Sequence, residues 1–212
     1  MQNILIELHY LPSIAYFSAL YKADEIYIAS QGRFEKRTYL NRSTILTANG
    51  PLDLSVPVFG ANKRIPIQEV KIDYHEKWVN NHWRAIQSAY GKSPFFDFYS
   101  EEIKKILYSS PSHLFALNKS LLTMCLKFLQ IDKPVIWQEN IEEITKPDLT
   151  DMRGDIHPRK PISELLWFDP KTYQQIFGSN FVSNLNILDL LFCTGPEALE
   201  VLKRSVVSSL NK

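Results

Sequence analysis

The first thirty residues constrain the fold most, because apolar runs and a helix pattern alternate there. Residues 4–8 form a short apolar run, Ser13 can cap a helix of about ten residues, and residues 25–29 form a second run. A helix between two strands predicts a βαβ unit, in which the strands lie parallel. Residues after each strand, His9 and 30–33, then meet at one edge, where open α/β sheets bind ligands.

A second pattern predicts a β-hairpin. Residues 43–46 and 52–58 flank Asn49-Gly50-Pro51, and Asn-Gly is a strong turn signal. Residues 67–72 are a weaker strand pattern. The strands are therefore expected mainly in the first third of the chain.

Helix patterns dominate the remainder. One helix is expected to start at the capping-box pair Asp73 and Glu76 and to end at a left-handed Gly91, and another to cover residues 169–178. Residues 145–161 are polar and hold three prolines, which predicts a long loop. The fold class predicted is mixed α/β, with an N-terminal βαβ unit, a hairpin and mainly helical last two-thirds. We expect residues 1–212 to form one domain.

Charge and hydropathy exclude several classes of protein. The 24 Lys and Arg balance 23 Asp and Glu, which argues against a protein that coats nucleic acid or an anionic membrane. No apolar run reaches the roughly 18 residues of a membrane helix. The N-terminus has no signal-peptide pattern, so a cytoplasmic protein is expected. Cys125 and Cys193 fall in apolar helix patterns and are expected to be free thiols.

The common catalytic and metal-binding motifs are absent. The sequence has no GxGxxG, GxxxxGK[ST], GxSxG or HExxH motif, so the usual signals for dinucleotide, P-loop and serine-hydrolase chemistry are missing. The five histidines form no HxxxH pattern, and two cysteines form no CxxC pair. No metal site is predicted, and no cofactor is indicated.

The segment 33–42 carries the densest charge of the chain. It holds four cations against Glu35, and a loop of this kind after a parallel strand could bind a phosphate or carboxylate. The alternative is an ordinary solvated turn.

Two other segments contain residue types suited to a site. Trp78 and His82 are four residues apart on one helix face, where they could offer an aromatic platform or belong to the core. Asp155 lies two residues before His157 and could orient its imidazole for general-base work, or the two could be metal ligands.

Several segments, in a fixed order over nearly the whole chain, carry a family resemblance: His9-Tyr10-Leu11-Pro12, residues 34–42, residues 49–58, Trp78 with His82-Trp83, Pro94-Phe95-Phe96, residues 156–160, Tyr173-Gln174 with Phe177, and residues 184–192 with Gly195-Pro196-Glu197. They resemble the WbqC-like protein family. Many relatives carry paired acids where this chain has Ser30-Gln31, so a metal or base role of those acids does not carry over.

The resemblance implies a place in O-antigen and other surface-polysaccharide biosynthesis. It also implies transfer of glycine or another acyl group to an amino sugar of a nucleotide-sugar. Such a reaction needs a base, donors for an oxyanion and a cationic clamp for phosphates. The residues expected in these roles are His9 or His157 as base; Asn41 as oxyanion or substrate donor; Lys36, Arg42 and Arg159 for phosphate; and Tyr39, Trp78 and His82 beside the sugar or base.

Two other functions compete with this hypothesis. A non-catalytic binding or assembly protein of the same pathway would use the cationic loop to dock an acidic partner. An RNA-binding module is weaker, because the positive charge is confined to one loop. The sequence leaves the oligomeric state and the identity of donor and acceptor open.

Overall fold

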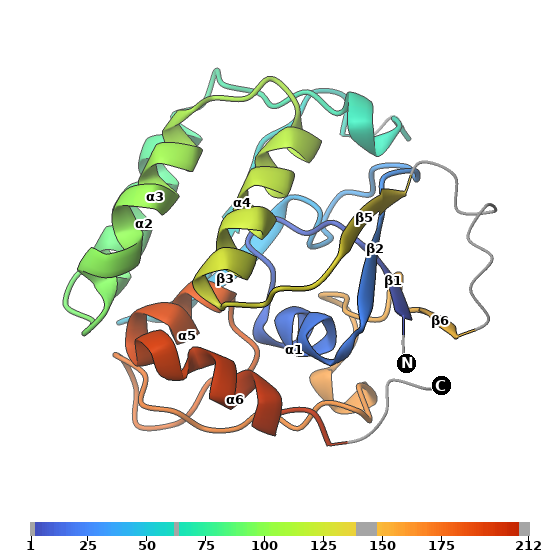
Figure 1. Ribbon diagram of the computed structural model, residues 1–212. Coiled ribbons are helices and arrows are strands. Elements are labelled where there is room, and N and C mark those ends of the chain that lie inside the picture. The colour runs from blue at the N-terminus through green and yellow to red at the C-terminus, as the bar shows by residue number, and fades with distance from the viewer. Residues whose placement is uncertain (1–2, 62–63, 139–147, 208–212) are drawn as a thin grey trace.

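The computed structural model describes residues 3–61, 64–138 and 148–207 of the chain (Figure 1). Its helices and strands follow this order: β1 (Asn3–Glu7), α1 (Ile14–Lys22), β2 (Glu25–Ala29), β3 (Arg42–Thr47), β4 (Gly50–Ser55), η1 (Ile67–Glu69), α2 (Trp78–Tyr90), α3 (Phe96–Tyr108), α4 (Leu114–Phe128), β5 (Val135–Gln138), β6 (Leu149–Asp151), η3 (Ile162–Glu164), α5 (Ile187–Thr194), η4 (Gly195–Glu197) and α6 (Ala198–Arg204). Here η denotes a 3₁₀ helix. The mixed α/β class, the parallel N-terminal unit and the hairpin β3–β4 are confirmed.

The main sheet has four parallel strands in the order β5-β2-β1-β6. β1 pairs with β2 on one side and with β6 on the other, so that Glu7 lies opposite Ala29 and Leu5 opposite Asp151. Taken by their order along the chain, the strands run 3-2-1-4. This order places a topological switch point, the usual site of ligand binding in open α/β sheets, between β1 and β6.

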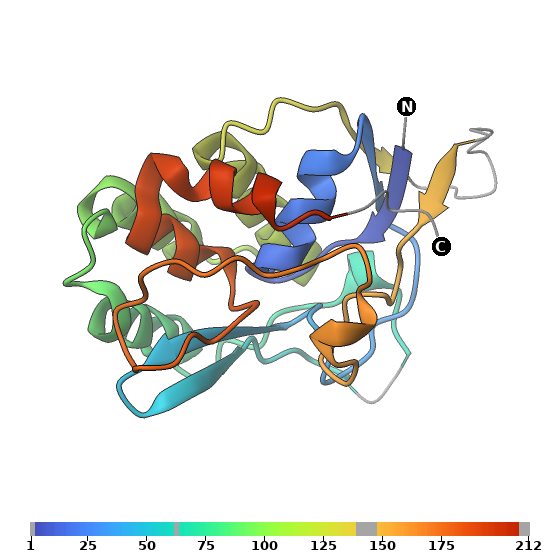
Figure 2. The same cartoon turned by 90° about the horizontal axis from the view of Figure 1, so that it is seen from below.

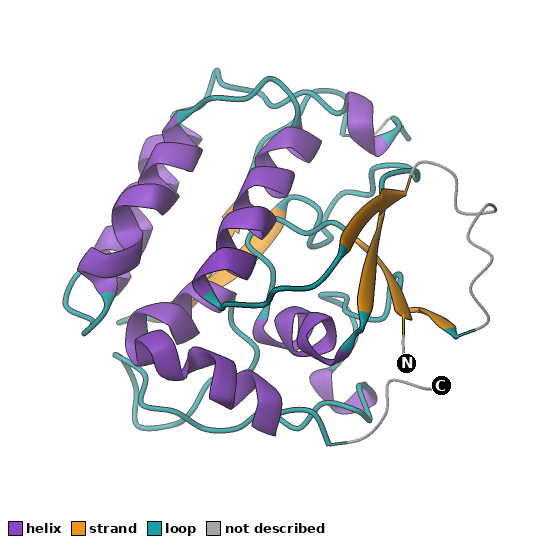
Figure 3. Cartoon of the chain, viewed as in Figure 1, coloured by secondary structure: helices purple, strands orange, loops and turns teal. Residues whose placement is uncertain are grey.

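One hydrophobic core joins this sheet to the helices. Figure 3 shows the helices in purple beside the orange strands of the sheet. Alternate residues of β1, Ile4 and Ile6, face the core that includes α1, while Leu5 faces a second, smaller cluster with Tyr27 and Ala29. In Figure 1, α4 lies between the sheet and the helix pair α2–α3. In Figure 2, the hairpin β3–β4 runs along the lower edge of the view. No helix among the described residues is both long and apolar enough to cross a bilayer.

Two expectations near the hairpin are wrong. Residues 67–72 do not form a strand: the Glu69 N–H donates to the Pro66 carbonyl at 2.9 Å, which turns the backbone into η1 and buries Ile67. Helix α2 begins at Trp78, because the Asp73 carboxylate accepts the His75 backbone N–H at 2.9 Å instead of capping a helix. Gly91 ends α2 in a right-handed conformation, with φ of −59°.

Two expectations in the last third are also corrected. No helix forms over residues 169–178, where the Gln175 side chain instead exchanges two 2.9 Å hydrogen bonds with the Val182 backbone. The expected loop 145–161 contains β6, which completes the sheet beside β1; its residues 145–147 lie outside the described part of the chain. β5 is half-buried along its whole length.

Candidate functional site

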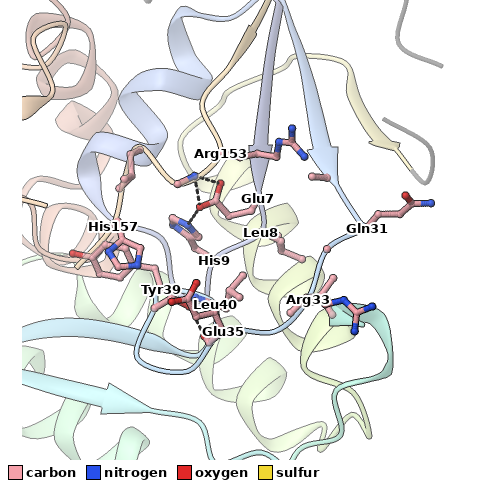
Figure 4. A pocket seen from close by; sticks show the side chains of 16 residues that line it. Glu7, Leu8, His9, Gln31, Arg33, Glu35, Tyr39, Leu40, Arg153 and His157 are labelled. Carbon is pink, nitrogen blue, oxygen red and sulfur yellow. Dashed lines mark hydrogen bonds and ion pairs between the residues drawn. The ribbon is translucent and has the colours of Figure 1, made fainter. Parts of the chain in front are cut away.

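A cavity of about 250 Å³ opens at the C-terminal edge of the sheet, at the switch point (Figure 4). Its walls come from the ends of β1, β2 and β6 and from the loop after β2. The lining residues are Glu7, Leu8, His9, Ala29, Gln31, Gly32, Arg33, Glu35, Thr38, Tyr39, Leu40, Ile67, Arg153, Gly154, Ile156 and His157. The parallel strands thus bring together segments about 150 residues apart in sequence.

Glu7 and His9 form a hydrogen-bonded carboxylate–imidazole pair in this cavity. His9 Nε2 lies 3.3 Å from Glu7 Oε1, and the Gly154 backbone N–H donates to the same carboxylate at 3.0 and 3.2 Å. Burial acts to raise the pKa of Glu7, but the hydrogen bond and electrostatic attraction of His9 and the backbone N–H groups together hold it below its usual value. The carboxylate is therefore ionised and bridges the ends of β1 and β6.

The hydrogen bonds of the His9 ring indicate its tautomer. Its Nε2 faces the Glu7 carboxylate, which accepts only, so this nitrogen carries the proton. Its Nδ1 is buried and has no hydrogen-bond partner among the described residues. A buried acceptor without a partner costs about 1–3 kcal/mol unless a water or a ligand group reaches it. The unprotonated nitrogen of His9 is therefore left without a partner in the described part of the protein.

His157 lies in the same cavity and is also the Nε2–H tautomer, but a different nitrogen of its ring is bound. Its Nδ1 accepts the Arg159 backbone N–H at 3.1 Å, so the proton of the neutral ring is on Nε2. The ring is half-buried and borders the cavity. The site thus combines a proton acceptor, His9, with a hydrogen-bond donor, His157.

Aromatic rings pack around this pair, and a separate ion pair lies on one side of the cavity. The rings of Tyr16 and Tyr39 lie 4.9 and 5.4 Å from the His9 ring, and the Tyr16 hydroxyl donates to the Glu7 carbonyl. Arg153 pairs with Asp151 at 2.6 Å on the β6 side of the cavity. Contacts of this kind limit rotation of His9 and keep its hydrogen bond to Glu7.

The family model of the WbqC-like protein family matches residues 8–156, which is most of the chain and includes His9 and the loop after β2. The chain belongs to the WbqC-like family. It is also 25% identical, over 94% of its length and 96% of the relative's, to the uncharacterised protein Rv1507c of Mycobacterium tuberculosis. No solved structure matches it. Gln31 of this WbqC-like chain lines the cavity.

The cavity brings together three of the residues that the sequence indicated: His9, His157 and Tyr39. Lys36 lines a neighbouring open hollow of about 450 Å³, which also contains Arg33 and Arg64. Because Arg33 and Glu35 line both spaces, the hollow adjoins the cavity on its cationic side.

Three other candidates of the WbqC-like chain lie elsewhere. Asn41 is buried and its amide donates to the Val56 carbonyl at 2.8 Å, so it ties the loop to the hairpin instead of lining the cavity. Arg42 faces Asp53 across the hairpin at 3.7 Å. Arg159 is exposed and contacts His157 through its backbone only among the interactions described.

Trp78 and His82 belong to the core of the WbqC-like chain and offer no open face to a ligand. They contact each other edge to face at 5.1 Å between ring centroids. The Tyr10 hydroxyl donates to His82 Nδ1 at 2.9 Å, and the other ring nitrogen bonds to the Ser55 backbone. Burial lowers the pKa of His82 to about 4, so this ring stays neutral.

The buried neutral His82 predicts acid sensitivity of the fold. Its folded pKa of about 4 lies below the unfolded value near 6.5, so stability falls as the pH drops from 6.5 towards 4. The shift corresponds to about 3 kcal/mol in the free energy of unfolding. Urea unfolding at pH 7.5 and 4.5 is expected to show this loss in the wild type and a much smaller one in His82→Gln, whose amide can keep both hydrogen bonds. His75→Gln, at an exposed site, should match the wild type; an undiminished loss in His82→Gln contradicts the assignment.

Among the charged lining residues, sequence reasoning placed Arg33 at this edge without giving it a role and did not propose Glu7, Glu35 or Arg153 as site residues. The signal for Glu7 is the Glu-x-His spacing at the end of a parallel strand, where residues two apart point the same way. Arg153 had no such signal, because β6 is only three residues long and polar.

Metal and thiol chemistry have little support in this part of the chain. No group of three or more His, Cys, Asp or Glu residues suited to a metal ion occurs among the described residues. Cys125 is fully buried, and burial raises the pKa of Cys193 to about 12, so neither thiol is activated as a nucleophile.

Proposed function

We propose that this chain is a transferase of surface-polysaccharide biosynthesis that moves a glycyl or other acyl group onto the amine of a nucleotide-linked amino sugar. The observation that carries this proposal is the Glu7–His9 pair, together with His157, whose Nδ1 is bound and whose Nε2–H is left as a donor, in one cavity at the ligand-binding edge of the sheet. Family membership supports the pathway, and the cavity supports the type of chemistry.

The two imidazoles supply what acyl transfer to an amine requires. The sugar amine attacks the acyl carbon of an activated donor such as a thioester, which forms the N–C bond and places negative charge on the carbonyl oxygen. His9, oriented by ionised Glu7, takes the proton that the nitrogen loses, and the Nε2–H of His157 donates to the oxyanion. The C–S bond then breaks, the thiolate leaves with the electron pair, and His9 returns the proton to it.

The cationic hollow next to the cavity suits the phosphates of a nucleotide-sugar. Arg33 donates to the Arg64 carbonyl at 2.9 Å, which fixes its guanidinium between the hollow and the cavity. Lys36 and Arg64 add positive charge to the same hollow. Diphosphate bound there would place the attached sugar towards Glu7 and His9, with Tyr39 as a stacking surface.

A transfer assay tests the proposed reaction. The purified protein is incubated with a glycyl thioester and a panel of UDP- and dTDP-linked amino sugars, and mass spectrometry monitors formation of the N-glycyl nucleotide-sugar. We expect product with at least one acceptor and none with the corresponding hydroxyl sugar, which lacks the amine. Binding of nucleotide-sugars without product from any of them would instead favour the non-catalytic binding protein.

The cationic hollow makes a separate prediction. Arg33→Ala is expected to raise KM for the nucleotide-linked acceptor about 10- to 100-fold, because a hydrogen bond to a charged group contributes about 1.5–3 kcal/mol. Its kcat should change little, and KM for the donor should be unchanged. Arg84→Ala, on an exposed position of α2, is the matched control and should leave both constants unchanged. Equal changes in both KM values would contradict a phosphate role for Arg33.

A further inference from the structure

A second cavity, of about 220 Å³, adjoins the first. Tyr39, Ile156 and His157 line both cavities, so these three side chains form a partition between two compartments of one cleft. The remaining walls of the second compartment come from the hairpin, from residues 160–165 and from residues 182–185. The proposed reaction so far assigns nothing to this space.

The far wall of the second compartment is held by hydrogen bonds to two other elements. At the start of α1, the Ile14 N–H donates to the Leu185 carbonyl at 3.0 Å, and the Ala15 N–H donates to the Asn184 side chain at 2.8 Å. The Asn186 N–H donates to Thr44 of β3 at 3.0 Å. Because these bonds fix the wall, the compartment is formed before any ligand enters it.

The chemistry of the lining indicates one class of ligand. Asp155 contributes a half-buried carboxylate, and Lys160 is held by a 2.7 Å hydrogen bond from its Nζ to the Gly154 carbonyl. The rest of the space is lined by apolar side chains, two prolines and three small polar residues, Thr44, Ser183 and Asn184. A carboxylate in such surroundings favours an ammonium group on a compact ligand.

We propose that this second compartment binds the donor, a small aminoacyl group whose free ammonium lies against Asp155. Since the acceptor sugar occupies the first cavity, the two substrates meet at the partition formed by Tyr39 and His157. The His157 Nε2–H then lies where the acyl carbonyl arrives. This inference rests on the proposed function, of which it names the second substrate.

Binding of a donor mimic tests the compartment without any turnover. Glycinamide carries the ammonium and a blocked carboxyl group, whereas acetamide lacks the ammonium. Titration of ¹⁵N-labelled protein with glycinamide is expected to shift the backbone amides of residues 155–157, 159–160 and 182–185, and acetamide is expected to leave them unchanged. Asp155→Asn, with wild-type unfolding temperature, should weaken glycinamide binding at least tenfold, while His9→Gln should bind it normally. Shifts elsewhere, equal shifts with acetamide, or unweakened binding by Asp155→Asn would overturn the proposal.

The transfer assay separates this inference from the proposed function. Asp155→Asn is expected to raise KM for the glycyl thioester at least tenfold and to leave KM for the nucleotide-sugar unchanged. Transfer with an unchanged donor KM would overturn the donor compartment and leave the reaction standing. Glycinamide binding at the expected amides without transfer to any amino sugar would support the compartment and contradict the reaction.

Discussion

Replacement of His9 by alanine is expected to lower kcat of the proposed transfer by about 100- to 10,000-fold, the range typical for loss of a general base. KM for either substrate should change much less, because the base acts on a proton that moves only in the transition state. Glu7→Gln is expected to lower kcat at least 100-fold, since a neutral amide neither stabilises the imidazolium nor fixes the tautomer. Steady-state kinetics with both substrates measures these effects.

The chain contains a matched control for this pair. Asp73 and His75 have the same spacing of two residues, with His75 Nδ1 2.7 Å from the Asp73 carboxylate, but His75 is 84% exposed and lies outside the cavity. The double variant Asp73→Asn/His75→Ala removes a carboxylate–imidazole pair of the same kind and should retain full kcat. Because His9 is buried, His9→Gln and a thermal unfolding curve exclude a folding defect. Wild-type kcat in a folded His9 variant would rule out His9 as the base.

The βαβ unit and the site edge could be predicted because local patterns decide them. Residues 4–8 and 25–29 are apolar and separated by a helix length, which leaves parallel pairing as the usual outcome. The position of His9 at the end of β1 then follows from chain direction alone. That edge contains the cavity, so the place of the site could be predicted from the sequence, although most of its lining residues could not.

Long-range hydrogen bonds explain the elements that the sequence did not predict. Residues 169–178 have helix boundary signals, yet Gln175 binds Val182 and the Tyr173 hydroxyl bonds to the buried carboxylate of Asp189. Such tertiary bonds override local propensity, and no local pattern shows them. β6 is a strand because β1 offers it an edge, and its own three residues carry no strand pattern.

Contacts with distant parts of the chain also explain why two candidate site residues lie outside the cavity. Asn41 and Arg42 lie next to Tyr39 in sequence, but the chain enters β3 there, and both side chains turn to hairpin partners. Glu7 was passed over because a single acid at the end of an apolar run is an ordinary strand end. A role for Glu7 follows only from its pairing with His9 and with the Gly154 N–H, which comes from the segment after β6, far along the chain.

Several family-like segments stabilise the fold instead of lining the cavity, and Gly195 provides the sharpest case. It ends α5 with φ of +55° and ψ of −125°, a conformation that only glycine adopts readily. A Cβ at this position would lie 2.4–2.6 Å from three ring atoms of Phe95, whose N–H donates to the Phe192 carbonyl at 3.1 Å. The Phe95 ring can therefore pack against residue 195 only when that residue is glycine.

Gly195→Ala is accordingly expected to lower the free energy of unfolding by roughly 4 kcal/mol, about half from backbone strain and half from the collision with Phe95. Urea unfolding measures this loss. Gly50→Ala, in a turn with φ of +100° and no atom within 4 Å of the added Cβ, carries the strain alone and should lose about half as much. In a Phe95→Leu background the cost of Gly195→Ala should also fall by about half, because the ring is gone. The same cost in both backgrounds would show that Phe95 yields without penalty, and the close packing of these two segments would then not be the reason for the glycine.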